Sequence, residues 1–283
     1  MSVIIPTSLH SALQALAAAP EATVLAGGTD LMVELNSGHR QVASVISVGR
    51  VPELCSWSHD PVAALLHLGA GITYDEIACG PLAKWVPALA HAARTVGSPQ
   101  IRHAATIGGN LGTCSPAGDG LPVLAALDAV VHLASLAGTR SMPFADYMVG
   151  PKRTARQPGE LITGVTMPVV RGWQGYSKVG VRNAMVIAVA SAALVADTDA
   201  RTVHVALGSV GPTILRCPDA EAFAAAHVDF AEGSVDDSVV ERFAELVRDA
   251  ARPIDDHRSS AAYRRHAVGV LAGRLLRRAF PDG

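Results

Sequence analysis

The chain has 283 residues, of which 49% are hydrophobic, and its 23 basic and 25 acidic residues give a formal net charge of −2. This length suits one large or two to three small domains, and the hydrophobic content supports an extensive core, which excludes disorder as the default. The near-neutral charge excludes a general electrostatic attraction to nucleic acid or to anionic lipid.

The cysteines and the amino terminus indicate the compartment in which the protein works. Cys55, Cys79, Cys114 and Cys217 are widely separated, without a CxxC pair for zinc, an iron–sulfur cluster or a redox disulfide. The amino terminus lacks a basic segment followed by a long apolar stretch, and no apolar run reaches the roughly 18 residues of a membrane span. We therefore expect a reduced, cytoplasmic protein with no membrane insertion and no metal site.

The first half of the chain alternates short helices and strands. Leucines at helical spacing after Thr7 or Ser8 predict a first helix, which Pro20 closes. A capping box of Thr73 and Glu76 predicts a short helix near 75–79. Strands are predicted at 22–26, at 43–48 and from residue 65. A helix is predicted over 82–95, where Pro87 limits or kinks it. A helical turn followed by a strand is predicted within 121–134.

The last third has a different rhythm, which predicts a domain boundary near Val170. Apolar runs at 175–181, 185–196 and 202–211 are separated by turn residues and predict one antiparallel sheet. Two helices follow, each with an apolar stripe that is typical of core packing. The stripes comprise Val239, Val240, Phe243, Leu246 and Val247 in the first helix, and Tyr263, Ala267, Val270 and Leu271 in the second.

Two glycine-rich segments carry the functional signal: VLAGGTDLM at 24–32 and TIGGNLGTCSPAGDGLP at 106–122. Glycine lets a turn expose several backbone N–H groups to one anion. Asp30 and Asp119 would repel a phosphate, so they are better suited to accept hydrogen bonds from sugar or polyol hydroxyls. Together the segments predict a diphosphate-bearing cofactor, although each glycine pair taken alone is also typical of an ordinary turn.

Other nucleotide-binding loops fit less well. Neither segment has the lysine followed by Ser or Thr that a P-loop requires. The sequence GAGITY at 69–74 begins like a dinucleotide fingerprint, but Tyr74 stands where the third glycine belongs. ATP hydrolysis and a Rossmann site are both disfavoured.

In this order and separation, the two segments resemble the FAD-binding subunit of the molybdenum hydroxylases, the group of xanthine dehydrogenase and aerobic carbon monoxide dehydrogenase. The similarity continues through GELITGVTMP at 159–168, KVGVR at 178–182 with the following IAVASAAL, and SSAAYRRHAVGVL at 259–271. It therefore covers nearly the whole chain. The resemblance implies an α+β fold: a two-lobed FAD-binding domain of the vanillyl-alcohol-oxidase/PCMH type over 1–170, with lobes of about 1–52 and 53–170, then a C-terminal α+β domain of the CO dehydrogenase flavoprotein type over 171–283.

The resemblance also implies which residues contact FAD. In the first segment the backbone and the Thr29 hydroxyl would hold the diphosphate. In the second segment Thr106, Gly108, Gly109 and Asn110 would complete this cradle, and Asp119 would accept bonds from cofactor hydroxyls. Ile162 and Lys178 match positions beside the isoalloxazine, where a lysine would stabilise negative charge on reduced flavin; the alternative is an exposed strand lysine. The implied set is Leu25, Ala26, Gly27, Gly28, Thr29, Asp30, Leu31, Val96, Thr106, Ile107, Gly108, Gly109, Asn110, Thr113, Asp119, Ile162 and Lys178.

Several positions depart from the family pattern. Val186 precedes Ile187 and Ala188 where the family often has an acidic residue, and Val96 stands where some animal members have a flavin-stacking aromatic residue. Cys114 lies inside the second segment, where it would either contact the cofactor or be a small packed residue. The cluster-bearing loop of the hydroxybenzoyl-CoA reductase branch is missing, which disfavours that branch.

The implied function is that of an electron-transfer subunit with no catalytic residue or metal ligand of its own. Molybdopterin and 2Fe-2S clusters would lie on partner chains, a large molybdenum subunit and a small two-cluster subunit, in a heterotrimer or a dimer of heterotrimers. Electrons would leave through FAD to NAD, oxygen or a quinone. The sequence SPAGDGLP at 115–122 slightly favours a xanthine or N-heterocycle dehydrogenase over a carbon monoxide or aldehyde dehydrogenase. A stand-alone flavin reductase and a non-redox nucleotide-binding protein remain alternatives.

Overall fold

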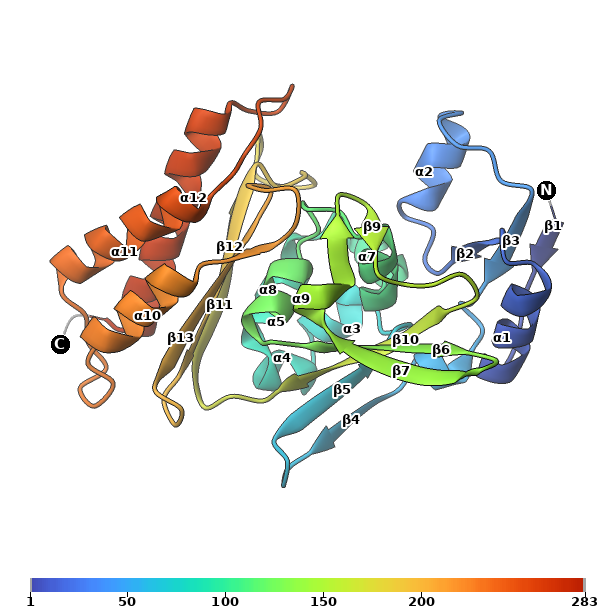
Figure 1. Ribbon diagram of the computed structural model, residues 1–283, viewed down its shortest axis with the longest axis horizontal. Helices are drawn as coiled ribbons and strands as arrows, with labels where there is room; N and C mark the ends of the chain where they lie inside the picture. Colours follow the sequence, from blue (N-terminus) through green and yellow to red (C-terminus); the bar gives the residue numbers. More distant parts are fainter. Residues whose placement is uncertain (1, 282–283) are drawn as a thin grey trace.

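The computed structural model describes residues 2–281, and its amino-terminal part is built on a three-stranded parallel sheet (Figure 1). The strand order is β1 (Ser2–Ile4), β3 (Ser44–Ser47) and β2 (Thr23–Leu25). Helix α1 (Leu9–Ala18) begins at Ser8, which forms a capping box with Ser11, and it buries Leu13 and Leu16 as the leucine spacing predicts. Helix α2 (Leu31–Asn36) follows the first glycine segment directly and has no fully buried residue.

The middle part is a five-stranded antiparallel sheet in the order β4, β5, β10, β6, β7. Its inward side chains, such as Leu66, Leu68 and Val165, are fully buried against short helices. The strands are β4 (Trp57–Asp60), β5 (Leu65–Gly69), β10 (Leu161–Pro168), β6 (Val130–Ser135) and β7 (Gly138–Pro143), with a small ribbon of β8 (Met148–Gly150) and β9 (Arg153–Thr154). The helices are η1 (Pro52–Leu54), α3 (Tyr74–Ala78), α4 (Leu82–Trp85), α5 (Pro87–Thr95), α6 (Pro99–Ala104), α7 (Ile107–Thr113), α8 (Leu121–Ala126) and α9 (Phe144–Tyr147).

The C-terminal part is a four-stranded antiparallel sheet with helices on both faces. Alternate residues of its strand β12 enter different cores: Ala193 and Val195 face α5 and α8, whereas Ala192 and Leu194 face the last three helices. A strand buried on both faces is apolar throughout. The elements are β11 (Gly172–Val179), β12 (Ala190–Asp197), β13 (Thr202–Gly208), β14 (Leu215–Arg216), α10 (Pro218–His227), α11 (Asp237–Ala250) and α12 (Ala261–Ala279).

Most predicted elements are confirmed, including the interruption by Pro87, which divides the helix predicted over 82–95 at Val86. Two predictions for the last third are wrong: the strand predicted from Met185 begins only at Ala190, and Tyr263 is 49% exposed rather than part of the core stripe. Helix α10 was not predicted. Among residues 2–281, no helix is long and apolar enough to cross a membrane.

A buried arginine ties the last helix to the C-terminal sheet. The side chain of Arg264 is 3% exposed, and it donates to the carbonyls of Val189 and Ser209 at 2.9 and 3.0 Å and to Asp256 Oδ1 at 2.6 Å. Burial tends to raise the pKa of Asp256, but the Arg258 amide and the Arg264 guanidinium outweigh it and hold the pKa well below its usual range. Asp256 therefore stabilises the fold while it is ionised.

Asp256→Asn is expected to lower the free energy of unfolding by about 2 kcal/mol at neutral pH, because it leaves the guanidinium of Arg264 buried without its counter-charge. A depressed folded-state pKa gives stability that is present above the unfolded value, about 3.9, and is lost as the pH falls. The difference between wild type and variant should therefore shrink in acid. Urea unfolding at several pH values measures this, with Asp199→Asn, in an exposed pair with Arg171, as the control. Equal losses in both variants would contradict the prediction.

Candidate functional site

The first glycine segment lies in close contact with the end of α6. A Cβ on Gly27 would lie 1.7 Å from the carbonyl oxygen of Ala104, so only glycine fits there. Gly28 has a φ of +74°, in the left-handed region that favours glycine. Leu25 ends β2 and Leu31 begins α2, so the segment is the connection between those two elements. Both glycines are therefore required by the shape of this turn.

The amides of the first segment are available to a ligand. Within residues 2–281, the main-chain N–H groups of Gly27, Gly28, Thr29 and Asp30 donate to no protein acceptor. Successive free N–H groups in a turn with a left-handed residue form the concave site that binds phosphate oxygens. This turn fits the diphosphate of FAD, both in its free donors and in its glycine backbone.

The second segment differs, because Gly108, Gly109 and Asn110 belong to helix α7 rather than to an open loop. The Thr106 side chain caps this helix by accepting from the Gly109 amide at 2.9 Å. The amides of Ile107 and Gly108 donate to the carbonyls of Ile72 and Ala70. The backbone amides of residues 107–110 thus already have acceptors within the protein. The role of the second segment in the diphosphate cradle stays a prediction.

Packing explains the second glycine pair. A Cβ on Gly108 would lie 2.5 Å from the Cβ of Ala70, so glycine allows α7 to approach the end of β5. A Cβ on Gly109 would lie 3.9 Å from the Cβ of Ala26, so Gly109 faces the first segment. Asp30 at the start of α2 accepts a hydrogen bond from Thr113 Oγ1, on α7, at 2.9 Å. The structure thus brings the two glycine segments together.

Thr113→Val should weaken FAD binding about three- to tenfold while changing stability by less than about 1 kcal/mol, because it removes the one hydrogen bond between Thr113 and Asp30. Titration of the full chain with FAD measures the affinity. Thr139→Val, at an exposed position of β7, is the matched control. An unchanged affinity in Thr113→Val would show that this bridge does not hold the first segment in its binding conformation.

Asp119 and Lys178 form a buried ion pair. Lys178 Nζ donates to Asp119 Oδ2 at 2.7 Å, to the carbonyl of Thr95 at 2.9 Å and to that of Val186 at 3.1 Å. Tyr176 donates its hydroxyl to Asp119 Oδ1 at 2.7 Å. Burial raises the pKa of Asp119, and the Lys178 ammonium and Tyr176 hydroxyl oppose the shift. The alternative of an exposed strand lysine is wrong, because the Lys178 side chain is only 8% exposed.

Asn110 is held by residues that the sequence did not single out for the site. Its Oδ1 accepts the Tyr74 hydroxyl at 2.7 Å, and a Cβ on Gly118 would lie 2.7 Å from its Nδ2. A Cβ on Gly120 would lie 2.5 Å from the Tyr74 hydroxyl. Tyr74 therefore supports α7 from the position at which a dinucleotide fingerprint would have glycine. No local signal pairs it with Asn110, which is 36 residues away.

The remaining predicted residues lie around this framework. Val96 follows α5 directly, next to Thr95, whose carbonyl accepts from Lys178. Ile162 lies at the bulge of β10 and is 8% exposed; a Cβ on Gly112 of α7 would be 3.7 Å from its Cδ1. Cys114 is fully buried at the end of α7, and burial raises the pKa of its thiol to about 11. Its interpretation as a small packed residue is confirmed.

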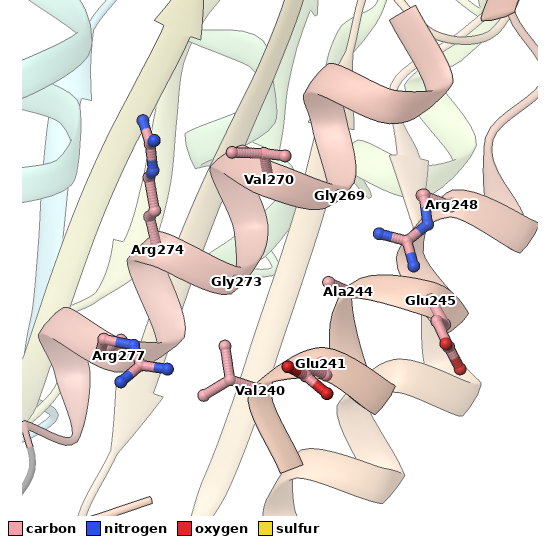
Figure 2. Close-up of a pocket in the computed structure, with 10 residues that line it drawn as sticks. All are labelled: Val240, Glu241, Ala244, Glu245, Arg248, Gly269, Val270, Gly273, Arg274 and Arg277. Atoms are coloured by element: carbon pink, nitrogen blue, oxygen red, sulfur yellow. The ribbon is translucent and has the colours of Figure 1, made fainter. Parts of the chain in front are cut away.

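A groove between α11 and α12 lies at the opposite end of the molecule from α2 (Figures 1 and 2). Its volume is about 410 Å³, and Figure 2 shows Glu241 and Arg274 on its two rims. A Cβ on Gly269 would lie 2.9 Å from the Ala244 carbonyl oxygen, so the groove is the outer surface of a close helix crossing. We assign the site to the glycine segments rather than to this groove, because the free amides and the buried ion pair lie there.

Comparison with known families identifies what this arrangement is. Residues 1–170 match the family model described as the FAD binding domain in molybdopterin dehydrogenase, and residues 176–279 match that of the CO dehydrogenase flavoprotein C-terminal domain. The chain belongs to the FAD-binding subunits of the molybdenum hydroxylases. The family membership, the α+β fold class and the oxidoreductase class predicted from the sequence are thereby confirmed.

Relatives with different substrates share this subunit type. The chain is 32% identical over 270 residues to the glyceraldehyde dehydrogenase medium chain of Sulfolobus acidocaldarius, covering 93% of this chain and 92% of that one. It is 31% identical to the nicotine 6-hydroxylase medium subunit of Paenarthrobacter nicotinovorans, covering 96% and 94%. Reconstituted CO dehydrogenase from Oligotropha carboxidovorans superimposes with a TM-score of 0.90 at 25% identity, covering 100% and 98%. This chain and that CO dehydrogenase chain thus share one fold over nearly their whole lengths.

Proposed function

We propose that this chain is the electron outlet of a larger molybdenum hydroxylase, in which it holds FAD between iron–sulfur clusters on a partner chain and an external acceptor. The observation that carries the proposal is the run of free amides at 27–30 beside α7. When bound, FAD supplies a carrier that accepts electrons singly and releases them as a pair. Everything else that the chain contributes is binding, orientation and charge.

In this proposal the first segment holds the diphosphate through the amides of Gly27 to Asp30, with the Thr29 hydroxyl as a further donor. The second segment supports it from α7 and contributes the carboxylate of Asp119. Both Asp119 oxygens already accept one protein hydrogen bond, and a carboxylate has about four lone-pair sites, so it retains capacity for a cofactor hydroxyl. If Asp119→Ala keeps wild-type FAD content and affinity, this role of Asp119 is wrong.

Lys178 is proposed to act on the flavin by its charge as well as by its contacts. Its ammonium is fixed by three acceptors, so its position relative to a bound ring does not depend on a flexible side chain. A fixed positive charge stabilises negative charge on reduced flavin and raises its midpoint potential. An unchanged midpoint potential in Lys178→Met would remove this part of the proposal.

We further propose that the chain divides near residue 170 into an FAD-binding domain, with lobes of about 1–52 and 53–170, and a C-terminal domain over 171–283. The separate sheets of the three regions support this division. Lys178 on β11 reaches Asp119 and Thr95 of the middle lobe, so the proposed site is completed by both domains. A cytoplasmic location is proposed from the four free cysteines.

The partners are proposed to be a large subunit with the molybdopterin cofactor and a small subunit with two 2Fe-2S clusters, in a heterotrimer or a dimer of heterotrimers. The relatives named as a medium chain and a medium subunit support such an assembly. We propose oxidation of an N-heterocycle as the reaction of the whole enzyme, supported by the nicotine relative; an aldehyde or carbon monoxide is the alternative. NAD, oxygen or a quinone would be the acceptor.

Purification of the full chain with the proteins that associate with it tests the proposal directly. A visible flavin spectrum, together with two further chains, one of them rich in cysteine, is the expected result. Native mass spectrometry then gives the stoichiometry. Protein that contains flavin but no partner chain would favour a stand-alone flavoenzyme, and protein that binds no flavin after addition of FAD would contradict the proposal.

A further inference from the structure

Strand β4 lies at one edge of the five-stranded sheet and carries aromatic side chains that are partly open to the surface. Trp57 is 40% exposed, and its ring meets that of Trp85 of α4 edge-on, with centroids 5.3 Å apart. His59 stacks on the same Trp85 ring at 4.4 Å. Two of the three tryptophans of the chain thus lie at this edge, and tryptophan is enriched among the residues that contribute most to protein–protein binding.

The β4–β5 hairpin projects from the body of the molecule (Figure 1). At its tip Val62 is 96% exposed, and Leu65 at the start of β5 is 39% exposed. Among residues 2–281, β5 is the one strand that pairs with β4. The other side of β4 is therefore accessible to a further strand.

The register of the hairpin shows which main-chain groups of β4 face outward. The amide of Gly69 donates to the Ser56 carbonyl at 2.8 Å, so these opposite residues form a hydrogen-bonded pair. Such pairs alternate along an antiparallel ladder, so Trp57 and His59 direct their N–H and C=O groups away from β5. Within residues 2–281, these outward groups bond to no other part of the chain. The β4 edge therefore offers two donors and two acceptors.

The opposite edge of the sheet is protected against strand pairing, whereas β4 is not. Natural sheets block their edges with proline and with charged side chains. Strand β7 contains Arg140 and ends in Pro143, which has no N–H. Strand β4 contains no proline and no basic residue other than a histidine. The carboxylate of its Asp60 accepts from the amides of Val62 and Ala63, so it is turned into the hairpin turn.

The outward groups of β4 are complementary to those of a second β4. About a two-fold axis at Ser58, Trp57 of one copy lies opposite His59 of the other, and the two residues exchange both N–H···O bonds. All four outward groups of each copy are then paired. The Trp57 and His59 rings of different copies also meet on one face of the sheet, as cross-strand aromatic pairs do. Asp60 lies opposite Ser56 of the second copy, so the two carboxylates do not face each other.

We propose that β4 pairs with β4 of a second copy of this chain, which joins two five-stranded sheets into one continuous sheet about a two-fold axis at Ser58. The inference goes beyond the proposed function and uses no residue of the candidate site. Because β4 has only four residues, the contact is small and the dimer should dissociate on dilution.

Oxidation of the full-length Ser58→Cys variant tests the position of the axis. Opposite residues that are not hydrogen-bonded to each other have Cα atoms about 4.5 Å apart, which is within the range of a disulfide. A reducible dimer linked at position 58, identified by mass spectrometry of its peptides, is the expected result. Ser238→Cys, at an exposed position of α11, is the matched control. Wild type shows whether the exposed Cys55 and Cys79 form links of their own.

Sedimentation equilibrium of the full chain at several concentrations measures the association itself. His59→Pro removes an outward N–H and no bond to β5, and proline is tolerated at such edge positions. His59→Ala loses the same ring but keeps the N–H. The proline variant is expected to dimerise at least about tenfold more weakly than the alanine variant, because two hydrogen bonds per dimer are lost. Thermal unfolding shows whether both variants are folded.

Three results would overturn the proposal. The first is a wild-type chain that stays monomeric at every concentration, with no link at position 58 in Ser58→Cys. The second is a dimer that His59→Pro leaves unchanged, because its contact would lie elsewhere. The third comes from purification with associated proteins: if the chain alone is monomeric and His59→Pro, but not His59→Ala, releases another polypeptide, the β4 edge binds a partner chain instead of a second copy.

Discussion

Gly27→Ala is expected to reduce the FAD affinity of the full chain more than a hundredfold. The added Cβ would lie 1.7 Å from the Ala104 carbonyl oxygen and 2.4 Å from the carbonyl carbon. These are backbone atoms, which cannot rotate away as a flexible side chain can, so the first segment has to leave its position beside α6. The free amides at 27–30 move with it and no longer converge on the diphosphate. Flavin content after incubation with excess FAD, followed by titration, measures the effect.

Gly49→Ala is the matched control, because a Cβ there meets no atom within 4 Å and its φ is not in the left-handed region. It should bind FAD as wild type does. Gly28→Val provides a second variant, since a β-branched residue is strained at a φ of +74° and should change the backbone conformation of the same turn. Thermal unfolding of each variant without FAD separates a lost site from a lost fold. A Gly27→Ala protein with wild-type affinity would show that the segment does not carry the diphosphate.

The first segment was predictable because its signal is local. An apolar strand that ends in two glycines and a hydroxyl residue fixes both the turn and its free donors within a few residues. The second segment contains the same residue types, yet its glycine pair lies within helix α7. Each glycine costs a helix about 1 kcal/mol relative to alanine, so the sequence alone favours a loop. Packing of Gly108 on Ala70, 38 residues earlier in the chain, outweighs that cost, and no local pattern reports it.

The apolar run at 185–196 illustrates a related limit. Its continuous apolarity predicts one buried strand, and the part from Ala190 onward is one. The part before Ala190 is the loop that exposes Met185 and Ile187. Apolar character alone does not fix where a strand begins, because it does not report which residues pair with the neighbouring strands β11 and β13.

The pairing of Asp119 with Lys178 depends on how the C-terminal sheet packs on the middle lobe. The sequence therefore predicts a separate role toward the cofactor for each residue but does not predict their contact. Because the pair is buried, Lys178→Met is expected to lower the free energy of unfolding by about 3–5 kcal/mol. The substitution leaves the Asp119 carboxylate in a water-poor site where, among residues 2–281, the Tyr176 hydroxyl is its one remaining donor. It also frees the carbonyls of Thr95 and Val186. Urea unfolding followed by far-ultraviolet circular dichroism measures the loss.

Two comparisons decide whether the loss comes from burial of charge. Lys152→Met removes a lysine whose Nζ is also 2.7 Å from a carboxylate oxygen, that of Glu34, but its side chain is 62% exposed. It should therefore cost less than about 1 kcal/mol. Lys178→Met with Asp119→Asn should recover part of the stability, because no unpaired charge remains. Burial raises the folded-state pKa of Asp119, so the single variant should lose stability as the pH rises through that pKa and regain it in acid. A pH-independent loss, equal in the single and double variants, would mean that packing rather than charge makes Lys178 necessary.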